Sequence, residues 1–365
     1  MQIDFYYRTF GELKTNKELG FNDPYNIMAS LNPKMREAVL HNPSGYREDE
    51  TCQILALDGD VVVGATNLFT GRLRLNGEVV QTQSGSYLFS HEDYRKDNVG
   101  GELFLMATNL HISKNNFYAG LSQMALPLYK VLKYKVFEFP RLIYLLKSRS
   151  VVQSVLRYDG FWTKPLVWFI DAILLFRHKC IRLVKLSRLK KYNVEEVKVV
   201  PREVEDIVMS DDHPFMELHD KAWFEWSLNY SISEDPRTKK KLFVVKNAER
   251  IEAFFLIKQE FFEKASSRGF ENVYLGSVME WGIAKESILK ESDLALLSLF
   301  YFDNNVDGIQ YSSSDLATIK DLKHYLFIQV GYSSIGFKIH TTKDPSLKDI
   351  NNWRVRLAAS DTVLN

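Results

Sequence analysis

The stretch from Ser86 to Leu103 combines the features of a phosphate-binding turn. It reads SYLFSHEDYRKDNVGGEL and passes from a strand-like run through a polar turn into a helix-like run. The amide groups that open a helix lack internal partners and carry the positive end of its dipole, so they bind phosphates. Asn98 is a residue type that tolerates left-handed backbone, and Gly100 and Gly101 let the backbone approach a ligand closely. An ordinary structural turn is the alternative interpretation.

A second polar cluster, Asp211–Asp220, carries potential metal ligands. His213 and Glu217 are four residues apart and would share one face of a helix, as metal ligands can. The spacing is not that of a zinc-binding HExxH pair, and Asp212-His213-Pro214 is typical of the start of a helix. We therefore expect a helix cap and an acidic acceptor-binding loop here, and no metal.

Composition limits the class of protein. The chain has 365 residues, 45% of them hydrophobic and 25% charged, which predicts a folded protein with more than one core. A net charge of +1 argues against a protein that coats nucleic acid. Cys52 and Cys180 form no CxxC pair, which suits a reducing cytoplasm. The N-terminus lacks the apolar core of a signal peptide, and the apolar run Pro165–Phe176 is too short to span a membrane.

The order of predicted elements occurs twice, which predicts an α+β protein with two related units. We expect domains at 1–150 and 195–365, joined by a connector at 151–194. In the first half the pattern predicts strands at Thr51–Leu57, Val61–Phe69, Gly71–Leu75, Glu78–Gln83, Ser86–Ser90 and Lys135–Phe139, and helices at Gly101–Ser113 and Ser122–Leu132. In the second half it predicts strands at Val194–Val200, Lys241–Val245, Ile251–Lys258, Asn272–Trp281, Gly308–Ser312 and Ser334–Thr341, and helices at Ser292–Asn304 and Ser314–Val330.

The segment from Lys130 to Lys191 is strongly basic. It holds fifteen basic residues against three acidic ones, with large apolar residues such as Trp168 and Phe176 between them. One interpretation is a helical connector whose basic faces are simply solvated. The other is a cationic amphipathic surface that rests on an anionic membrane or holds a polyanionic substrate.

The element order and the turn together resemble the GNAT superfamily of acyl-CoA-dependent N-acyltransferases. The pyrophosphate loop of that family reads Arg/Gln-x-x-Gly-x-Gly/Ala, and Arg95–Gly100 matches it at its first and last positions, with Asn98 in place of the middle glycine. The resemblance implies two mixed, mostly antiparallel sheets flanked by helices, and acetyl-CoA or another acyl-CoA as co-substrate. The residues that it implies for CoA binding are Leu88, Phe89, Ser90, Arg95, Lys96, Asn98, Val99, Gly100 and Gly101.

The resemblance also suggests catalytic residues. The helix-like segment Ala125–Tyr134 resembles the block in which many family members carry a tyrosine that protonates the departing CoA thiolate, and Tyr129 takes that position. An amine acceptor must also lose a proton. His91, Glu92 and Glu280 are the candidate bases, and the alternatives are exposed loop charges for the first two and a buried ion pair for Glu280. Core packing is the alternative for Tyr129.

The second half is similar to the partner lobe of tandem-GNAT proteins from bacterial surface-polysaccharide clusters. The similarity lies in Trp223–Tyr230, in Met279-Glu280-Trp281 and in Val330-Gly331-Tyr332. No Arg-x-x-Gly-x-Gly turn follows Glu280, so we expect CoA on the first half and the acceptor partly on the second.

The resemblance implies N-acylation of an amino group, with a nucleotide- or lipid-linked amino sugar as the favoured acceptor. Two alternatives stay open. One is a Fem-type peptidyl transferase that uses aminoacyl-tRNA, and the other is a non-catalytic GNAT pair that binds a partner or a membrane. We expect no DNA partner and a cytoplasmic location, with peripheral membrane contact through the basic connector.

Overall fold

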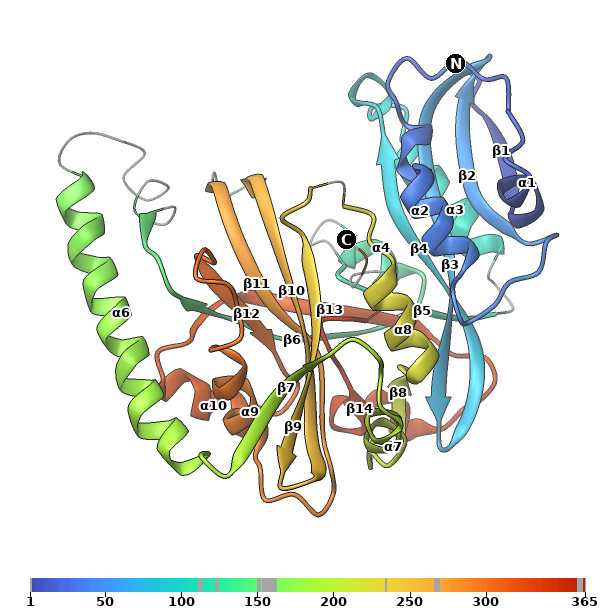
Figure 1. The fold of residues 1–365 in the computed structure, drawn as a ribbon. Coiled ribbons are helices and arrows are strands. Elements are labelled where there is room, and N and C mark those ends of the chain that lie inside the picture. Colours follow the sequence, from blue (N-terminus) through green and yellow to red (C-terminus); the bar gives the residue numbers. More distant parts are fainter. Residues whose placement is uncertain are drawn as a thin grey trace.

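One continuous mixed sheet runs through the protein, with helices packed on both of its faces (Figure 1). The computed structural model describes residues 2–110, 114–121, 125–149, 152, 163–233, 235–265, 270–359 and 364. Within these residues the strand order is β1-β2-β3-β4-β5-β13-β6-β12-β11-β10-β9-β7, and β8 pairs with β3 and β14. The predicted α+β class is confirmed.

The strands alternate with helices in an order that repeats. The strands are β1 Asp4–Thr9, β2 Thr51–Asp58, β3 Val61–Leu75, β4 Glu78–Ser90, β5 Asn115–Ala119, β6 Lys135–Leu145, β7 Tyr192–Val197, β8 Phe215–Glu217, β9 Lys239–Asn247, β10 Arg250–Ala265, β11 Phe270–Ile283, β12 Gly308–Ser312, β13 Ile328–Lys338 and β14 Trp353–Arg354. The α-helices are α1 Phe10–Lys14, α2 Pro33–Leu40, α3 Val99–Leu110, α4 Leu126–Val131, α6 Thr163–Arg188, α7 Arg202–Met209, α8 Lys221–Asn229, α9 Glu291–Ser298 and α10 Leu316–His324. Short 3-10 helices lie at Met28–Leu31, Glu92–Tyr94, Pro345–Lys348 and Ile350–Asn352.

Tight turns set the register of three hairpins. Gly59 joins β2 to β3 with a φ of +61°, and Asn76 and Gly77 join β3 to β4 with φ values of +51° and +90°. Positive φ at both central residues is the geometry that matches the twist of antiparallel strands. Ala248 takes a φ of +52° in the turn between β9 and β10. All three turns fall between strands that the sequence pattern predicts.

The first-half strands are longer than the sequence predicts. The runs assigned to separate strands on either side of Thr70 form one strand, β3, and those on either side of Gly85 form one strand, β4. Gly71, the predicted first residue of a separate strand, lies within β3, where an added Cβ would stand 2.9 Å from Thr82 Oγ1. The glycine therefore permits a close approach between neighbouring strands.

The second half differs at its helix ends. The helix predicted at Ser314–Val330 ends at His324, and Leu326 takes a φ of +62° before β13 begins at Ile328. The helix predicted at Ser292–Asn304 ends at Ser298. A left-handed residue ends the helix. The residues from Ile328 onward form strand β13 instead, which pairs with β6 from Ile328 to Phe337.

The basic segment is only partly helical. Residues 135–145 form β6, and the helix α6 covers Thr163–Arg188. Two predicted helix ends, the start at Ser122 and the end at Ser113, lie outside the described residues. Within the described residues, α4 begins at Leu126 and α3 ends at Leu110. The predicted helix through His213 and Glu217 is wrong, because Phe215–Glu217 pairs with β3 as strand β8.

The two halves of the sheet exchange their last strands. β4 runs parallel to β5, and β11 runs parallel to β12, while the other pairs along the main sheet are antiparallel. β13, from the end of the chain, lies between β5 and β6, and β6 pairs in turn with β12. Strands far apart in sequence are thus adjacent in the centre of the sheet.

Candidate functional site

A cavity of about 700 Å³ lies where β4 and β5 diverge. Within the described residues these two parallel strands pair at Thr82–Asn115 and Gln83–Asn116 and no further. Beyond this point the space between them is lined by side chains from β4, α3, β5 and α4. Among the lining residues are Thr66, Gly85, Tyr87, Leu88, Asn98, Gly100, Gly101, Phe104, Tyr118, Gly120, Leu121, Leu128 and Tyr129.

A bulge in β4 shapes one wall of the cavity. Tyr87 has a φ of +53°, and the pairing with β3 skips there, so that Tyr87 and Leu88 together oppose Thr66. A bulge turns backbone groups out of the ladder and re-aims side chains. Leu88 is 44% exposed at the cavity, although it lies in the middle of a sheet.

The start of α3 forms the second wall. Asn98 takes the left-handed conformation that its position predicted, with a φ of +57°, and its carbonyl accepts the first helical bond from Glu102. An added Cβ at Gly101 would stand 2.4 Å from the Asn98 side-chain oxygen. Glycine at 101 thus makes room for the Asn98 side chain, while the amides of Val99, Gly100 and Gly101 open the helix.

The structure brings together part of the predicted CoA site. Leu88, Asn98, Gly100 and Gly101 line the cavity. The described lining does not include Phe89, Ser90, Arg95, Lys96 or Val99; Val99 is buried in the core, and Arg95 and Lys96 are exposed in the turn before α3.

Tyr129 stands on α4 and lines the cavity opposite α3. It packs edge-on against Phe104, Tyr118 and Tyr134, with ring centroids 4.9–5.2 Å apart. Burial, reinforced by Tyr134, raises the pKa of Tyr129 well above its ordinary value. Tyr129 is therefore protonated at neutral pH.

Sequence reasoning missed several lining residues. Tyr118 and Gly120 come from the end of β5, and Tyr87 comes from the bulge. The run Asn116-Phe-Tyr-Ala-Gly120 is a short apolar run that ends in glycine, and that signal indicates a strand without giving its place in the sheet. The bulge at Tyr87 has no comparable signal, because tyrosine is a favourable strand residue.

His91 and Glu92 lie just past β4 and are not among the described lining residues. The His91 ring stacks on Tyr25 with centroids 3.7 Å apart, and its Nδ1 lies 3.5 Å from Asp93. Glu92 is exposed. A role for either residue as base stays a prediction.

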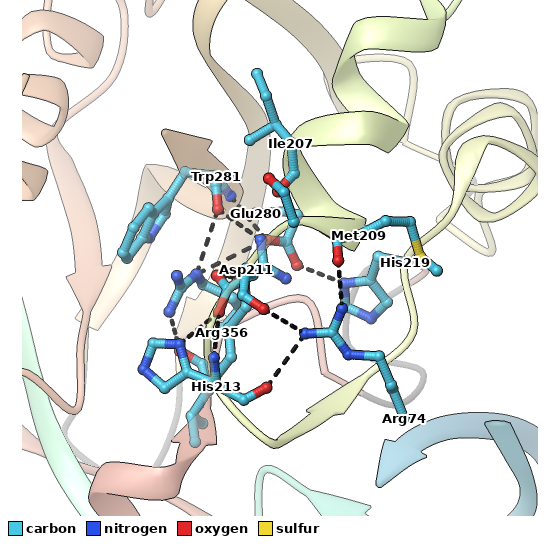
Figure 2. A network of polar contacts seen from close by, with 12 residues as sticks. Arg74, Ile207, Met209, Asp211, His213, His219, Glu280, Trp281 and Arg356 are labelled. Atoms are coloured by element: carbon cyan, nitrogen blue, oxygen red, sulfur yellow. Dashed lines mark hydrogen bonds and ion pairs between the residues drawn. The ribbon is translucent and has the colours of Figure 1, made fainter. Parts of the chain in front are cut away.

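Glu280 lies at the centre of a buried polar network instead of in the cavity (Figure 2). It is fully buried, bonds to His219 and receives a 2.6 Å hydrogen bond from Arg354. Arg356 lies 3.7 Å away. Burial alone would raise the pKa of Glu280, but Arg354 and His219 outweigh it and lower the pKa to about 2. This arrangement matches the ion-pair alternative, and a catalytic role for Glu280 stays a prediction.

The same network joins the two halves of the chain. Arg74 of β3 donates to the carbonyls of Met209, Asp211 and His213 at 2.7–3.2 Å (Figure 2). Asp211 in turn pairs with Arg354 at 3.0 Å. The predicted loop at 211–220 therefore carries structural contacts.

His213 and Glu217 do not converge on a shared ligand. His213 Nδ1 bonds to Asp211 at 2.5 Å, whereas Glu217 lies 3.4 Å from His219 Nε2. Within the described part of the chain, no group of three His, Cys, Asp or Glu side chains is arranged to hold a metal ion.

The fold is that of GNAT-type N-acyltransferases. Saccharomyces cerevisiae N-myristoyltransferase with bound myristoyl-CoA superposes with a TM-score of 0.54 and 12% sequence identity, covering 92% of this chain and 82% of that one. A GCN5-related N-acetyltransferase from Anabaena variabilis superposes with a TM-score of 0.52 and 11% identity, covering 93% of this chain and 73% of that one. No protein-family model matches the sequence, and no curated protein matches it significantly.

Replacing Glu280 tests the buried network. In Glu280→Gln we expect a free energy of unfolding that is lower by roughly 3–5 kcal/mol at neutral pH, because Arg354 and Arg356 both lose the buried negative charge that they share. A carboxylate with a depressed pKa stabilises the fold above its unfolded pKa, and this stabilisation disappears as the pH falls through the folded value. The wild type should therefore lose stability between about pH 5 and pH 2, and the variant should show a shallower slope.

Urea unfolding followed by circular dichroism at a series of pH values measures both effects. Glu286→Gln is the matched control, because the Glu286 side chain is 73% exposed and pairs with Arg250 at the surface. Equal stability of Glu280→Gln and the wild type at neutral pH would contradict this account of the network.

Proposed function

We propose that the protein transfers an acyl group from acyl-CoA to an amine. The observation that carries the proposal is the cavity between β4 and β5, bounded by the opening of α3 on one side and by Tyr129 on the other. The fold supports it, since yeast N-myristoyltransferase has the same fold and its structure holds myristoyl-CoA.

The residues present suit the parts of acyl-CoA. The amides that open α3 carry partial positive charge, and they would hold the diphosphate. Beyond Gln83, the facing edges of β4 and β5 no longer pair with each other. The two amides of a pantetheine arm can satisfy such edges as an added strand would. The acyl chain would lie among the apolar residues Phe104, Leu105 and Leu128.

The reaction then needs polarisation of the thioester carbonyl, protonation of the leaving thiolate and removal of a proton from the amine. A backbone N–H that the bulge at Tyr87 and Leu88 turns out of the ladder would polarise the thioester carbonyl. The amine nitrogen forms a bond to the acyl carbon while the C–S bond breaks, and Tyr129 donates its proton to the leaving thiolate. His91 and Glu92 remain our candidates to take the proton of the amine, directly or through water, because they directly follow β4.

The acceptor that we propose is an amino sugar of surface-polysaccharide synthesis, and the location is the cytoplasm. We further propose that residues 1–150 and 195–365 are two GNAT-like units. The repeated order supports this division, because β2-β3-β4-α3-β5-α4-β6 is matched by β9-β10-β11-α9-β12-α10-β13. Only the first unit has a glycine-bearing turn at the start of its central helix, which supports CoA on that unit.

Replacing the tyrosine tests the proposed acid. Tyr129→Phe keeps the aromatic packing, so we expect unchanged stability and unchanged affinity for acyl-CoA. The value of kcat should fall about 10²-fold, because the thiolate leaves without a proton donor. Initial rates of CoA release, measured with acetyl- to myristoyl-CoA and a panel of amino sugars, check this.

The control is Tyr46→Phe, which alters a stacked tyrosine far from the cavity in the first-half core around Phe10. Equal kcat for Tyr129→Phe and the wild type would refute the acid role. Transfer that requires aminoacyl-tRNA and stops on RNase treatment would favour the peptidyl transferase. Absence of transfer with every donor would favour a non-catalytic binding module.

A further inference from the structure

A second cavity, of about 300 Å³, adjoins the first. Ala119 and Gly120, at the end of β5, line both cavities. From there the second cavity extends over one face of the sheet, across β13, β6, β12, β11 and β10. The opposite face of these strands is packed against α9 and α10 through Tyr144, Ile257 and Ile309.

The sheet register places polar side chains together on the cavity face. Lys258 pairs with Ser277, and Ser277 pairs with Gln310 on the next strand. Paired residues of neighbouring strands share a face. Arg141 of β6 and Glu260 of β10 line the same cavity.

Cationic groups predominate around this cavity. Arg141, Lys258 and Arg356 line it, against one carboxylate, Glu260. Lys258 is only 5% exposed and pairs with Glu260 at 2.9 Å. Arg356 is 6% exposed, stacks at 3.3 Å over the Trp281 ring and shares Glu280 with Arg354.

Lys240 lies on the neighbouring strand β9, on the same face of the sheet as Lys258. Burial together with the charge of Lys258 lowers the pKa of Lys240 to about 7. Cations enclosed in a sheltered cavity are compensated best by an anion, and a guanidinium forms paired hydrogen bonds with phosphate or carboxylate.

We propose that the second cavity binds the acceptor, and that the acceptor carries a phosphate or carboxylate group in addition to its amine. The inference rests on the proposed function, because it places the acceptor next to the proposed acyl-CoA cavity, which the second cavity meets at Gly120. A phosphorylated amino sugar fits the chemistry, and an amino acid would satisfy the same cations through its carboxylate.

Calorimetry on the full chain saturated with CoA tests this directly. The probes are glucosamine, which carries no anionic group, glucosamine 6-phosphate and glucosaminuronic acid. We expect glucosamine 6-phosphate or glucosaminuronic acid to bind at least about ten-fold more tightly than glucosamine, because each gains a charge-assisted bond. Arg141→Gln should weaken that ligand about ten-fold, Arg141→Lys should weaken it less, and CoA affinity should stay unchanged.

The control variant is Arg47→Gln, whose side chain is 75% exposed at the surface. Tighter binding of the phosphate probe than of the carboxylate probe would show that the acceptor carries a phosphate. The reverse order would show that it carries a carboxylate. Equal binding of the anionic probes and glucosamine, binding of none of them, or an unchanged affinity in Arg141→Gln would overturn the inference. Loss of CoA binding in the wild type would instead overturn the proposed function.

A separate surface on α6 carries a second inference. The inner side of this helix is fixed to the protein: Asp171 accepts a hydrogen bond from Ser148 at 2.6 Å, and Arg177 lies 3.9 Å over the Tyr144 ring. The outer side carries large apolar residues in solvent, since Trp168, Phe176 and Leu183 are 73%, 69% and 75% exposed. Figure 1 shows α6 at the outer edge of the molecule.

Basic residues accompany this apolar face. Lys179 falls on the same side as Trp168 and Phe176 by helical periodicity, and Lys164 and Arg182 lie along its margin. All three are exposed. Tryptophan and phenylalanine bordered by lysine and arginine are typical of helices that lie in the interface of an anionic membrane. Within the described residues no helix combines the length and apolar character needed to cross a bilayer.

We infer that the outer face of α6 rests on an anionic membrane surface. Co-sedimentation of the full chain with phosphatidylcholine vesicles, with and without about 30% phosphatidylglycerol, tests it. We expect binding to the anionic vesicles that weakens with salt, and at least about ten-fold weaker binding for the double variant Trp168→Ser/Phe176→Ser.

The matched control is Val199→Ser/Ile288→Ser, which alters two residues that are each 75% exposed outside α6. Absence of vesicle binding, or equal binding by the two double variants, would overturn the inference. So would a dimer in solution, detected by light scattering, that the α6 double variant converts to a monomer, because a second copy would then cover this face.

Discussion

The edge of β4 that faces β5 pairs with it at only two positions, Thr82 and Gln83, in the described chain. The strands part there because the Tyr87 bulge redirects β4, while β5 is held on its other edge by β13. Within the described residues, the facing edges of the two strands are therefore not paired with each other beyond Gln83. The cavity, the exposure of Leu88 and the approach of α4 all follow from this separation.

Strand exchange keeps the opening in place. β13 adds to β5 and β6, and β12 pairs with β6, so closing the cavity would disrupt ladders that join distant parts of the chain. The buried network at Glu280 also connects the two halves, because Arg74 of the first half donates hydrogen bonds to the carbonyls of the loop that carries Asp211. The exchanged strands and the buried network together hold the second cavity next to the first at Ala119 and Gly120.

Local features were predictable from sequence, and features that depend on distant contacts were not. Asn98, Asn76 and Gly59 take the left-handed conformations that their types favour, so the turns and the start of α3 could be predicted. The contribution of Tyr118 to the cavity lining could not be predicted, because it depends on the position of β5 between β4 and β13. Glu280 was a candidate base from its position on a strand, but its partners His219 and Arg354 come from loops and a strand far along the chain.

Calorimetric titration of acetyl-CoA and myristoyl-CoA into Gly100→Asp and Gly100→Asn tests the central claim, that the opening of α3 holds the diphosphate beside the cavity. Aspartate in the first turn stabilises a helix, so both variants should fold as the wild type does. The account predicts wild-type binding that both variants weaken, because each adds a side chain where the backbone approaches the diphosphate. Gly100→Asp should weaken it at least about ten-fold more than Gly100→Asn, because only aspartate repels the diphosphate. Equal affinity of the two variants, or no binding by the wild type, would contradict it.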